Sequence, residues 1–336
     1  MAQMGFFDLS DKLSALSKLG DPLEKLNQAV DWSIFQPVLA RAFRKERKSQ
    51  AGRPAYEYLL MFKVLILQSM YNLSDAQTQF QILDRLSFRR FLGASTEQVP
   101  DEKTIWLFRE TLTQRGAIEK LFGIFDRHLS QAGYQARKGQ IVDASFVEVP
   151  RQRNRKEENE QILKGETPKG WEEKPAKLCQ KDLDARWTKK NGTKHYGYKN
   201  HVNIDVKHKL IRQYVVTPAN VHDSRVLLQD RDNTYQAMWG DSAYSSEKIR
   251  KQLKRKGIVD KINRKGYRNR PLSEFQVLLN RKKSKIRARV EHAFGRLGFM
   301  IGRWIRCLGE VRAAARIGLM NLTYNLHRYE YLAKRA

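Results

Sequence analysis

The hydrophobic pattern changes its period near residue 138, and this change divides the chain into two parts. In the first part, apolar side chains recur every three or four residues, which is typical of amphipathic helices. Ser, Asp or Pro stands near the start of each of these segments, as expected at helix N-termini. The sequence therefore predicts an all-helical domain over residues 1–137, with helices at 7–19, 21–30, 56–73, 74–86, 101–116 and 117–133.

The second part, residues 138–336, is predicted to be an α/β domain. Dense β-branched and aromatic residues indicate strands, and helical spacing returns between the later ones. We expect strands at 139–149, 198–206, 209–219, 235–244 and 258–263, and helices at 223–232, 245–257 and 284–297. A meander of strands followed by strand–helix alternation predicts a mixed sheet. Residues 151–190 are polar and charged, and we expect them to form a long basic loop or arm.

The net charge of +28 is unevenly distributed along the chain. Residues 1–137 carry a net charge of only +4, whereas residues 248–289 hold 17 Lys and Arg against 2 Asp and Glu, a net charge of +15. A solvated surface normally mixes both signs, so this block predicts a polyanionic partner, and nucleic acid is the commonest one. The alternatives are a disordered basic tail, which the apolar residues inside the block argue against, and an RNA-binding protein of ribosomal type.

Two classes of protein are disfavoured by simple features. Cys179 and Cys307 are the only cysteines and lie far apart, so the sequence predicts neither a disulfide framework nor a zinc site. The N-terminus lacks a basic region followed by an apolar core, and no apolar run has the length of a membrane span. We therefore expect a protein of the reducing cytoplasm that does not contact a membrane.

Two aspartates of the second domain lie inside or directly after an apolar run. Asp143 lies inside IVDASFV, and Asp241 follows AMWG. An unpaired carboxylate in such a place is costly, so a cation is expected to meet it. A crossover sheet places these strand ends side by side, and convergent carboxylates without Cys or His favour a hard divalent cation such as Mg²⁺ or Mn²⁺. The alternative is that each aspartate only accepts local hydrogen bonds at its strand end or turn.

Glu291 is a third candidate acid, on the helix expected over 284–297. The apolar residues of this helix form one stripe, and Glu291 lies off it, one turn beyond Arg287. Glu291 is therefore expected to point away from the core of its helix. The alternative is a surface ion pair with Arg287, which is common on helices and contributes little.

The three acids are spaced by 98 and 50 residues: Asp143 in IVDASFV, Asp241 in WGDSAY and Glu291 in RARVEHAFG. They resemble the DDE triad of bacterial transposases of the insertion-sequence-five family, in the insertion-sequence-four-like superfamily. HYGYKNHVNID and VVTPANVHDS resemble that family's second and third strands. LSFRRFLG and PDEKTIWLFRETL resemble its helical N-terminal domain. The resemblance covers roughly residues 32–330. It implies a ribonuclease H-like fold after residue 138 and a helical domain for DNA binding and dimerisation before it.

The resemblance also implies a reaction. In such transposases, carboxylates hold two Mg²⁺ or Mn²⁺ ions about 4 Å apart. Asp143 is then expected to bridge both ions, Asp241 to bind one, and Glu291 to bind the other and orient the nucleophile. Hydrolysis at the terminal inverted repeats of an insertion sequence is followed by attack of the freed 3′-hydroxyl on target DNA. The implied partners are double-stranded DNA and a second copy of the chain, and the implied location is the bacterial nucleoid.

The family signature Tyr-x2-Arg-x3-Glu-x6-Lys is incomplete in this chain. Arg287 and Glu291 fit it, but Ser284 and Gly298 stand at the Tyr and Lys positions. The phosphate contacts of the missing Lys are expected from Arg296 or from Arg303.

Further polar residues are candidates for weaker roles. His201, Asn220, His222 and His292 are expected near the reaction site as supporting groups, although a lone His is more often a structural residue. The basic residues expected to contact DNA are Lys199, Lys254, Arg255, Lys256, Lys261, Arg264, Lys265, Arg281, Lys282, Lys283, Arg287 and Arg296.

Two other functions are compatible with parts of this pattern. A nuclease with a ribonuclease H-like fold, such as a junction resolvase, shares the acids but does not transfer strands. A catalytically inactive DNA-binding regulator shares the basic block and the helical domain. Metal-dependent nicking and joining of a pre-cleaved 3′-hydroxyl end distinguish the three.

Overall fold

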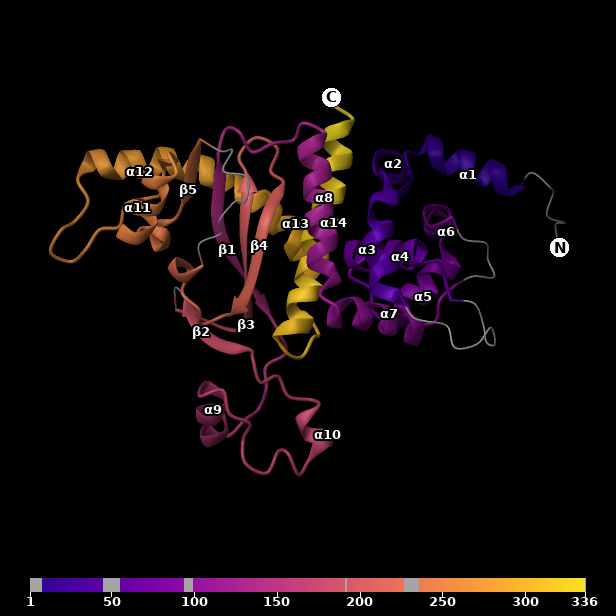
Figure 1. Cartoon of the computed structure of the whole chain (residues 1–336), viewed down its shortest axis with the longest axis horizontal. Coiled ribbons are helices and arrows are strands. Elements are labelled where there is room, and N and C mark those ends of the chain that lie inside the picture. Colours follow the sequence, from indigo (N-terminus) through magenta and orange to yellow (C-terminus); the bar gives the residue numbers. More distant parts are fainter. Residues whose placement is uncertain (1–7, 45–54, 94–98, 191, 227–235, 336) are drawn as a thin grey trace. The chain divides into compact units, whose positions relative to one another are not determined.

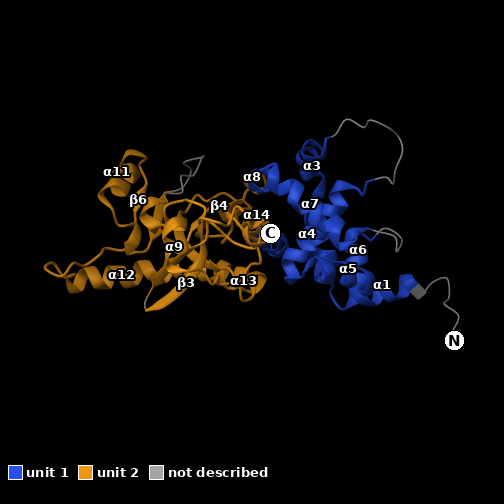
Figure 2. Ribbon diagram, turned by 90° about the horizontal axis from the view of Figure 1, so that it is seen from below, with its two compact units in different colours: residues 1–128, 322–336 blue, residues 129–321 orange. Residues whose placement is uncertain are grey.

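The computed structural model describes residues 8–44, 55–93, 99–190, 192–226 and 236–335 (Figure 1). The chain forms two compact units, residues 1–128 with 322–336, and residues 129–321 (Figure 2). Two helices, α8 (Ala117–Gln131) and α14 (Glu310–Ala333), belong in part to each unit. Residues 322–336 join the first unit, where Tyr329 of α14 packs against the rings of Phe125 and His128. The expected domain boundary at residue 137 stays a prediction.

The first unit is helical, as the period of its apolar residues predicts. Its remaining elements are α1 (Asp8–Lys18), α2 (Pro22–Ala29), η1 (Trp32–Phe35), α3 (Gln36–Phe43), α4 (Tyr58–Tyr71), α5 (Asp75–Asp84), α6 (Leu86–Leu92) and α7 (Glu102–Gln114). The sequence did not predict η1 and α3, which are too short to show a clear period. Helix α4 is apolar on all sides and nearly all of it is buried, so it forms the centre of this unit.

The second unit contains one mixed sheet, as predicted. Its strands are β1 (Gln140–Glu148), β2 (Arg186–Lys190), β3 (Thr193–Asp205), β4 (Ile211–Pro218), β5 (Ala237–Gly240) and β6 (Val259–Asp260). Their order is β2-β3-β1-β5-β6, and β4 also pairs with β3. β3 is antiparallel to β1, β2 and β4, whereas β1, β5 and β6 are parallel. The central position of β1 brings the meander and the crossover strands together around it.

The helices of this unit include α11 (Glu247–Arg255), α12 (Glu274–Arg287) and α13 (Glu291–Ile301), with short 3-10 turns η2 (Asp223–Arg225), η3 (Ser242–Tyr244) and η4 (Ala288–Val290). α11 contacts β6, and α12 contacts β5. The helix expected over 223–232 begins as the 3-10 turn η2, and its residues after 226 lie outside the described part of the chain.

The helix expected over 284–297 is divided into two by η4. Val290 is fully buried, and Arg287 reaches the carboxylate of Asp143. A 3-10 turn has fewer residues per turn than an α-helix, so it changes which side chains face the core across this short segment. Tertiary contacts of Val290 and Arg287 thus override the continuous helical period of the sequence.

Residues 151–185 form a folded lobe, in contrast to the expected loop. This α9–α10 lobe contains α9 (Lys156–Leu163) and α10 (Pro175–Leu178), and it extends beyond the ends of β2 and β3 (Figure 1). Trp171 is 1% exposed, its indole N–H donates to Glu158 at 2.8 Å, and the ammonium group of Lys177 lies over its ring. Burial of this large aromatic residue among polar partners contributes to the order of a segment that composition alone predicts to be irregular.

The lobe returns to the sheet through Asp182, which is 1% exposed. Its carboxylate accepts hydrogen bonds from the Tyr198 hydroxyl at 2.9 Å and from the N–H groups of Asp184 and Ala185 at 2.9 Å. Asp182→Ala leaves these buried donors unpaired, so we expect the free energy of unfolding to fall by about 2–4 kcal/mol. Urea unfolding measures the change, with exposed Glu172→Ala as the control. Equal stability of the two variants would contradict this role.

No helix in the described segments is both long and apolar enough to cross a membrane.

Candidate active site

Asp143, inside β1, and Asp241, directly after β5, lie next to each other on adjacent parallel strands. The register pairs Val142 of β1 with Gly240 of β5, and the next residue on each strand is one of the two aspartates. Parallel strands run in the same direction, so both carboxylates stand at the place where the pairing of β1 with β5 stops. This is the arrangement that the expected strand order implies.

The carboxylate of Asp143 is buried and contacts a cation. Its side chain is 9% exposed, and Oδ2 accepts a hydrogen bond of 2.7 Å from Nη1 of Arg287. Burial raises the pKa of Asp143 to about 6; Arg287 and the Ala144 amide lower it, and the charge of Asp241 raises it. Desolvation and repulsion by the second carboxylate therefore outweigh the contact with Arg287.

Both aspartates also accept local hydrogen bonds, as the alternative interpretation expects. Oδ1 of Asp143 accepts from the N–H of Ala144 at 2.9 Å. Oδ1 of Asp241 accepts from the N–H of Ala243 at 2.8 Å, where Asp241 is the N-cap of η3. Because these bonds use one oxygen of each carboxylate, they fix the orientation of both groups without excluding a cation.

This pair of carboxylates suits a hard divalent cation. Two anionic groups on neighbouring strands, one of them buried with a raised pKa, repel each other until a cation lies between or beside them. Within the described part of the chain, no group of three or more Asp, Glu, His or Cys side chains is arranged to hold a metal ion. Asp143 and Asp241 therefore fit as a partial ligand set, which oxygens of water or of a substrate would complete.

Glu291 is the first residue of α13, and its side chain is exposed. Among the described residues, it does not form a metal-binding group of three side chains with the two aspartates. The alternative ion pair with Arg287 is not formed in the expected way, because Arg287 contacts Asp143. The role of Glu291 as a third ligand stays a prediction, and it requires α13 to approach the aspartates. His292, beside it, is exposed as well.

Lys199 lies inside the protein rather than on a DNA-binding surface. It is 8% exposed, and its Nζ donates to the Val221 carbonyl at 2.7 Å and to the Asp223 carboxylate at 2.8 Å. Both partners of its ammonium group belong to the segment that follows β4, which holds the side chain in the interior. The structure thus corrects the expected phosphate contact: Lys199 is half of a buried ion pair.

The remaining supporting candidates are not gathered at one point. His201 is fully buried, its Nε2 contacts the Thr217 hydroxyl at 2.9 Å, and burial lowers the pKa of His201 to about 4. It is therefore neutral at physiological pH and belongs to the interior of the sheet. Asn220 and His222 are exposed after β4, where Nδ1 of His222 accepts from the N–H of Ser224 at 3.2 Å.

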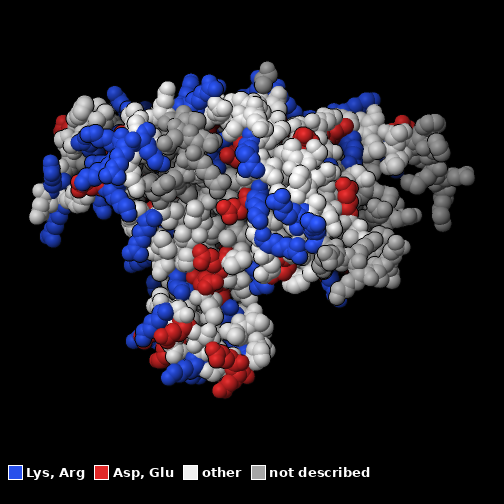
Figure 3. Space-filling view, in the orientation of Figure 1, with Lys and Arg blue, Asp and Glu red and all other residues white. Residues whose placement is uncertain are grey.

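Most basic candidates lie on an exposed surface over α11 and α12, where Figure 3 shows Lys and Arg gathered. Nζ of Lys283 donates to the Ile262 carbonyl at 2.8 Å, and Arg296 lies over the ring of Phe299, so both are partly buried. The exposed members, which we call the basic surface, are Lys254, Arg255, Lys256, Lys261, Arg264, Lys265, Arg281 and Lys282.

Hydrogen bonds tie the segment after β6 to α12 beneath this surface. Nδ2 of Asn263 donates to the Ser284 hydroxyl at 3.0 Å. The N–H of Arg264 donates to Oδ1 of Asn280 at 2.9 Å, and Nδ2 of Asn280 donates back to the Arg264 carbonyl at 3.0 Å. These bonds hold cations of the two segments together against their mutual repulsion.

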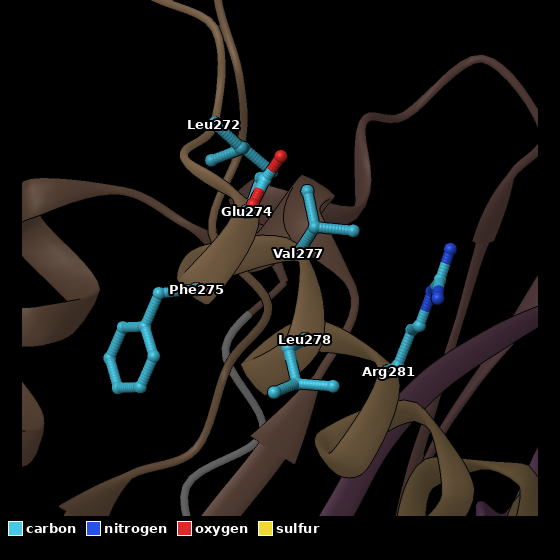
Figure 4. Close-up of a pocket in the computed structure, with 6 residues that line it drawn as sticks. All are labelled: Leu272, Glu274, Phe275, Val277, Leu278 and Arg281. Atoms are coloured by element: carbon cyan, nitrogen blue, oxygen red, sulfur yellow. The ribbon is translucent and has the colours of Figure 1, made fainter.

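A surface hollow of about 520 Å³ lies along α12 (Figure 4). Its lining contains neither Asp143 nor Asp241, so it is a groove beside the basic surface and not the reaction site. It is lined by Leu272, Glu274, Phe275, Val277, Leu278 and Arg281.

Sequence reasoning missed two residues near the carboxylate pair. Asp223 was not among the candidate residues, but it pairs with Lys199. Tyr244 is 1% exposed, and Asp223, Asp143 and Asp241 each act to raise its pKa. The stretch GDSAY contains both Asp241 and Tyr244, so the signal for Tyr244 was its distance of three residues from a candidate acid.

The raised pKa of Asp143 predicts that this residue destabilises the metal-free fold at neutral pH. Between pH 3.8 and about 6 the folded state binds more protons than the unfolded state, so stability falls as pH rises through this window. Asp143→Asn removes the effect, and we expect it to raise the free energy of unfolding at pH 8 by up to about 3 kcal/mol. At pH 4 the gain should be small.

Urea unfolding of wild type and Asp143→Asn in EDTA at both pH values measures this difference. An equal gain at pH 4 and pH 8 would show that ionisation of Asp143 is not its cause.

Comparisons with known proteins add an independent observation. The family model described as transposase DDE domain matches residues 134–326, more than half of the chain. A second model, described as transposase domain (DUF772), matches residues 11–111. A solved structure, the cryo-EM structure of a piggyBac transposase synaptic complex with hairpin DNA, shares 12% sequence identity over 94% of this chain and 76% of that chain. Its TM-score is 0.44, which is too low to carry an argument.

Proposed function

The chain belongs to the family of proteins that carry the transposase DDE domain, and from this membership we propose that it cleaves and joins DNA strands with the help of divalent metal ions. The observation that carries the proposal is the pair Asp143 and Asp241, adjacent where two parallel strands stop pairing, inside the matched segment. The basic surface on α11 and α12 supports a polyanionic substrate.

We further propose the finer assignment to the insertion-sequence-five family, with a ribonuclease H-like catalytic unit. The mixed sheet, with β1 in its centre and a carboxylate on each of two neighbouring strands, is compatible with that fold. The match of residues 11–111 to a second transposase domain supports a role of the helical unit in the same process. In this proposal the protein acts as a homodimer on terminal inverted repeats and target DNA.

Asp143 and Asp241 would hold the metal, and Glu291 would complete the set once DNA is bound. When bound, Mg²⁺ or Mn²⁺, with two ions proposed, supplies charge stabilisation for the in-line displacement at phosphorus. The chain's own residues have other tasks. The hydrogen bonds from Ala144 and Ala243 orient the carboxylates, and the basic surface binds the phosphate backbone, which fixes register without reading bases.

The test uses purified full-length protein and duplex DNA that carries the inverted repeats flanking its gene. We expect nicking at the repeat ends with Mg²⁺ but not with EDTA, and joining of a pre-cleaved 3′-hydroxyl end to a second duplex. Nicking without joining would identify a nuclease of the resolvase type instead. Binding without nicking in any divalent metal would identify a DNA-binding regulator.

A further inference from the structure

Strand β2 and the first part of β3 form a two-stranded ribbon at one edge of the sheet, which we call the β2–β3 ribbon (residues 186–190 and 193–197; Figure 1). The register places Lys189 directly opposite Lys194, so both side chains lie on the same face of the ribbon. Like charges in this position repel each other and destabilise the strand pairing. Residues 186–195 include no Asp or Glu that could compensate them. An anion bound between the two lysines would remove this repulsion.

Trp187 lies on the same face of the ribbon, two residues before Lys189. Its side chain is 43% exposed, although the ring contacts Tyr196 at 4.9 Å between centroids and the guanidinium group of Arg151 at 5.5 Å. Lysines on an edge strand often serve to prevent pairing with another chain. An exposed indole ring acts against such protection, so protection does not explain the combination of Trp187 with the two lysines.

The exposed face of the ribbon contains a hollow of about 400 Å³, lined by Trp187, Thr188, Lys189 and Lys194. Sites for small ligands range over roughly 300–1,000 Å³. An aromatic ring beside cations is the arrangement that binds single-stranded nucleic acid, because a base stacks on the ring and the backbone meets the positive charges. Bases of an intact duplex already stack on one another, so only an unpaired base can stack on this ring.

The other face of the ribbon is anchored to β1. The ring of His195 stacks on Phe146 at 4.2 Å between centroids, and its Nδ1 lies 2.9 Å from Oε1 of Glu148. The ammonium group of Lys190 lies 5.6 Å from the centroid of the same Phe146 ring. The ribbon is therefore held on the strand that carries Asp143. It is distinct from the basic surface, because β2 and β6 stand at opposite ends of the strand order and α11 packs on β6.

We propose that the β2–β3 ribbon binds an unpaired segment of DNA, with a base stacked on Trp187 and an adjacent phosphate held by Lys189 and Lys194. The phosphate compensates the repulsion between the two ammonium groups. The inference rests on the proposed function, because cleavage of a strand beside β1 is the step that frees unpaired DNA there.

The first test compares the affinity of wild type and Trp187→Ala for a short labelled oligothymidylate and for a blunt duplex. Fluorescence anisotropy in EDTA measures binding without cleavage. We expect the variant to bind oligothymidylate about 10- to 100-fold more weakly, because one stacked base is lost. Its affinity for the duplex should remain close to that of the wild type. Trp106→Ala is the matched control, because Trp106 of α7 is also exposed, at 49%, and its loss should change neither affinity.

The second test replaces Lys189 and Lys194 together with Gln. Each lost phosphate contact should lower the slope of log affinity for oligothymidylate against log salt by about 0.7. The variant should unfold at the same or a higher temperature, because the repulsion between the two strands is removed. Replacement of the exposed Lys164 and Lys169 with Gln removes the same charge from the α9–α10 lobe and should leave the slope unchanged.

The outcomes separate the inference from the proposed function. Normal binding of oligothymidylate by either ribbon variant overturns the inference, provided that the wild type binds duplex DNA. An equal loss of affinity for duplex and oligothymidylate in Trp187→Ala also overturns it, because no unpaired base is then recognised. Failure of the wild type to bind any DNA contradicts the proposed function itself.

Discussion

Asp143→Asn and Asp241→Asn are each expected to reduce the rate of metal-dependent DNA cleavage by on the order of 10³-fold or more. Each change replaces one of two adjacent anionic groups with a neutral amide of the same shape. The cation then loses a ligand, and with it several kcal/mol of charge stabilisation in the displacement; about 4 kcal/mol corresponds to this factor. Single-turnover nicking of repeat-end DNA in Mg²⁺ measures the rates.

Asp260→Asn is the matched control for these two variants. Asp260 ends β6, the next parallel strand, where Oδ1 accepts from the N–H of Ile262 at 2.8 Å and Oδ2 lies 3.4 Å from Arg250. We expect its cleavage rate to remain near that of the wild type.

Glu291→Gln should match the aspartate variants if α13 brings Glu291 to the site. Near-normal cleavage by any of the three acid variants removes that residue from the reaction.

Replacing Lys254, Arg255 and Lys256 together with Gln is expected to weaken DNA binding on the order of 10²-fold at about 0.1 M salt. All three side chains are exposed at the end of α11. Each lost phosphate contact should lower the slope of log affinity against log salt by about 0.9. The loss should be equal for repeat-end and random DNA, because phosphate contacts carry no base information. Titrations over a salt series measure both quantities.

The control removes the same charge elsewhere. Lys164, Lys169 and Lys174 are exposed on the α9–α10 lobe, and their triple replacement with Gln should change the affinity far less. An equal loss in this variant would mean that net charge alone matters. Loss of discrimination between repeat-end and random DNA, with an unchanged salt slope, would mean that the basic surface reads bases.

The adjacency of Asp143 and Asp241 was predictable because it depends on rules that act locally. Apolar runs around each aspartate indicate strands, and the alternation of strands and helices after residue 219 indicates parallel neighbours. Together these rules place the two aspartates on neighbouring strands without knowledge of any individual contact. The exposed position of Glu291 followed in the same way from the apolar stripe of its helix.

The sequence was less informative where a partner lies far along the chain. In the sequence, nothing distinguishes Lys199 from an exposed basic residue. In the structure it is buried and binds Asp223, 24 positions later. The end of α12 depends on Asp143, 144 positions away, which binds Arg287. The α9–α10 lobe contains a buried indole ring and a buried carboxylate, Asp182, and average composition does not reveal the partners of either group. Charge and hydrophobic period indicate whether a residue is suited to the surface or to the core. They do not identify the distant residue that it contacts.

The contact between Arg287 and Asp143 has a consequence for the proposed metal site. Oδ2 of Asp143 cannot hold the guanidinium group and a metal ion equally closely, so the two cations compete for it. Arg287 ends α12, the helix that carries Arg281 and Lys282, and a DNA phosphate bound there offers the guanidinium another anion. Affinity for metal and affinity for DNA then rise together, each by the same factor. Under the proposed function, such a protein would remain inactive in the presence of Mg²⁺ alone and would gain a competent metal site only where DNA is bound.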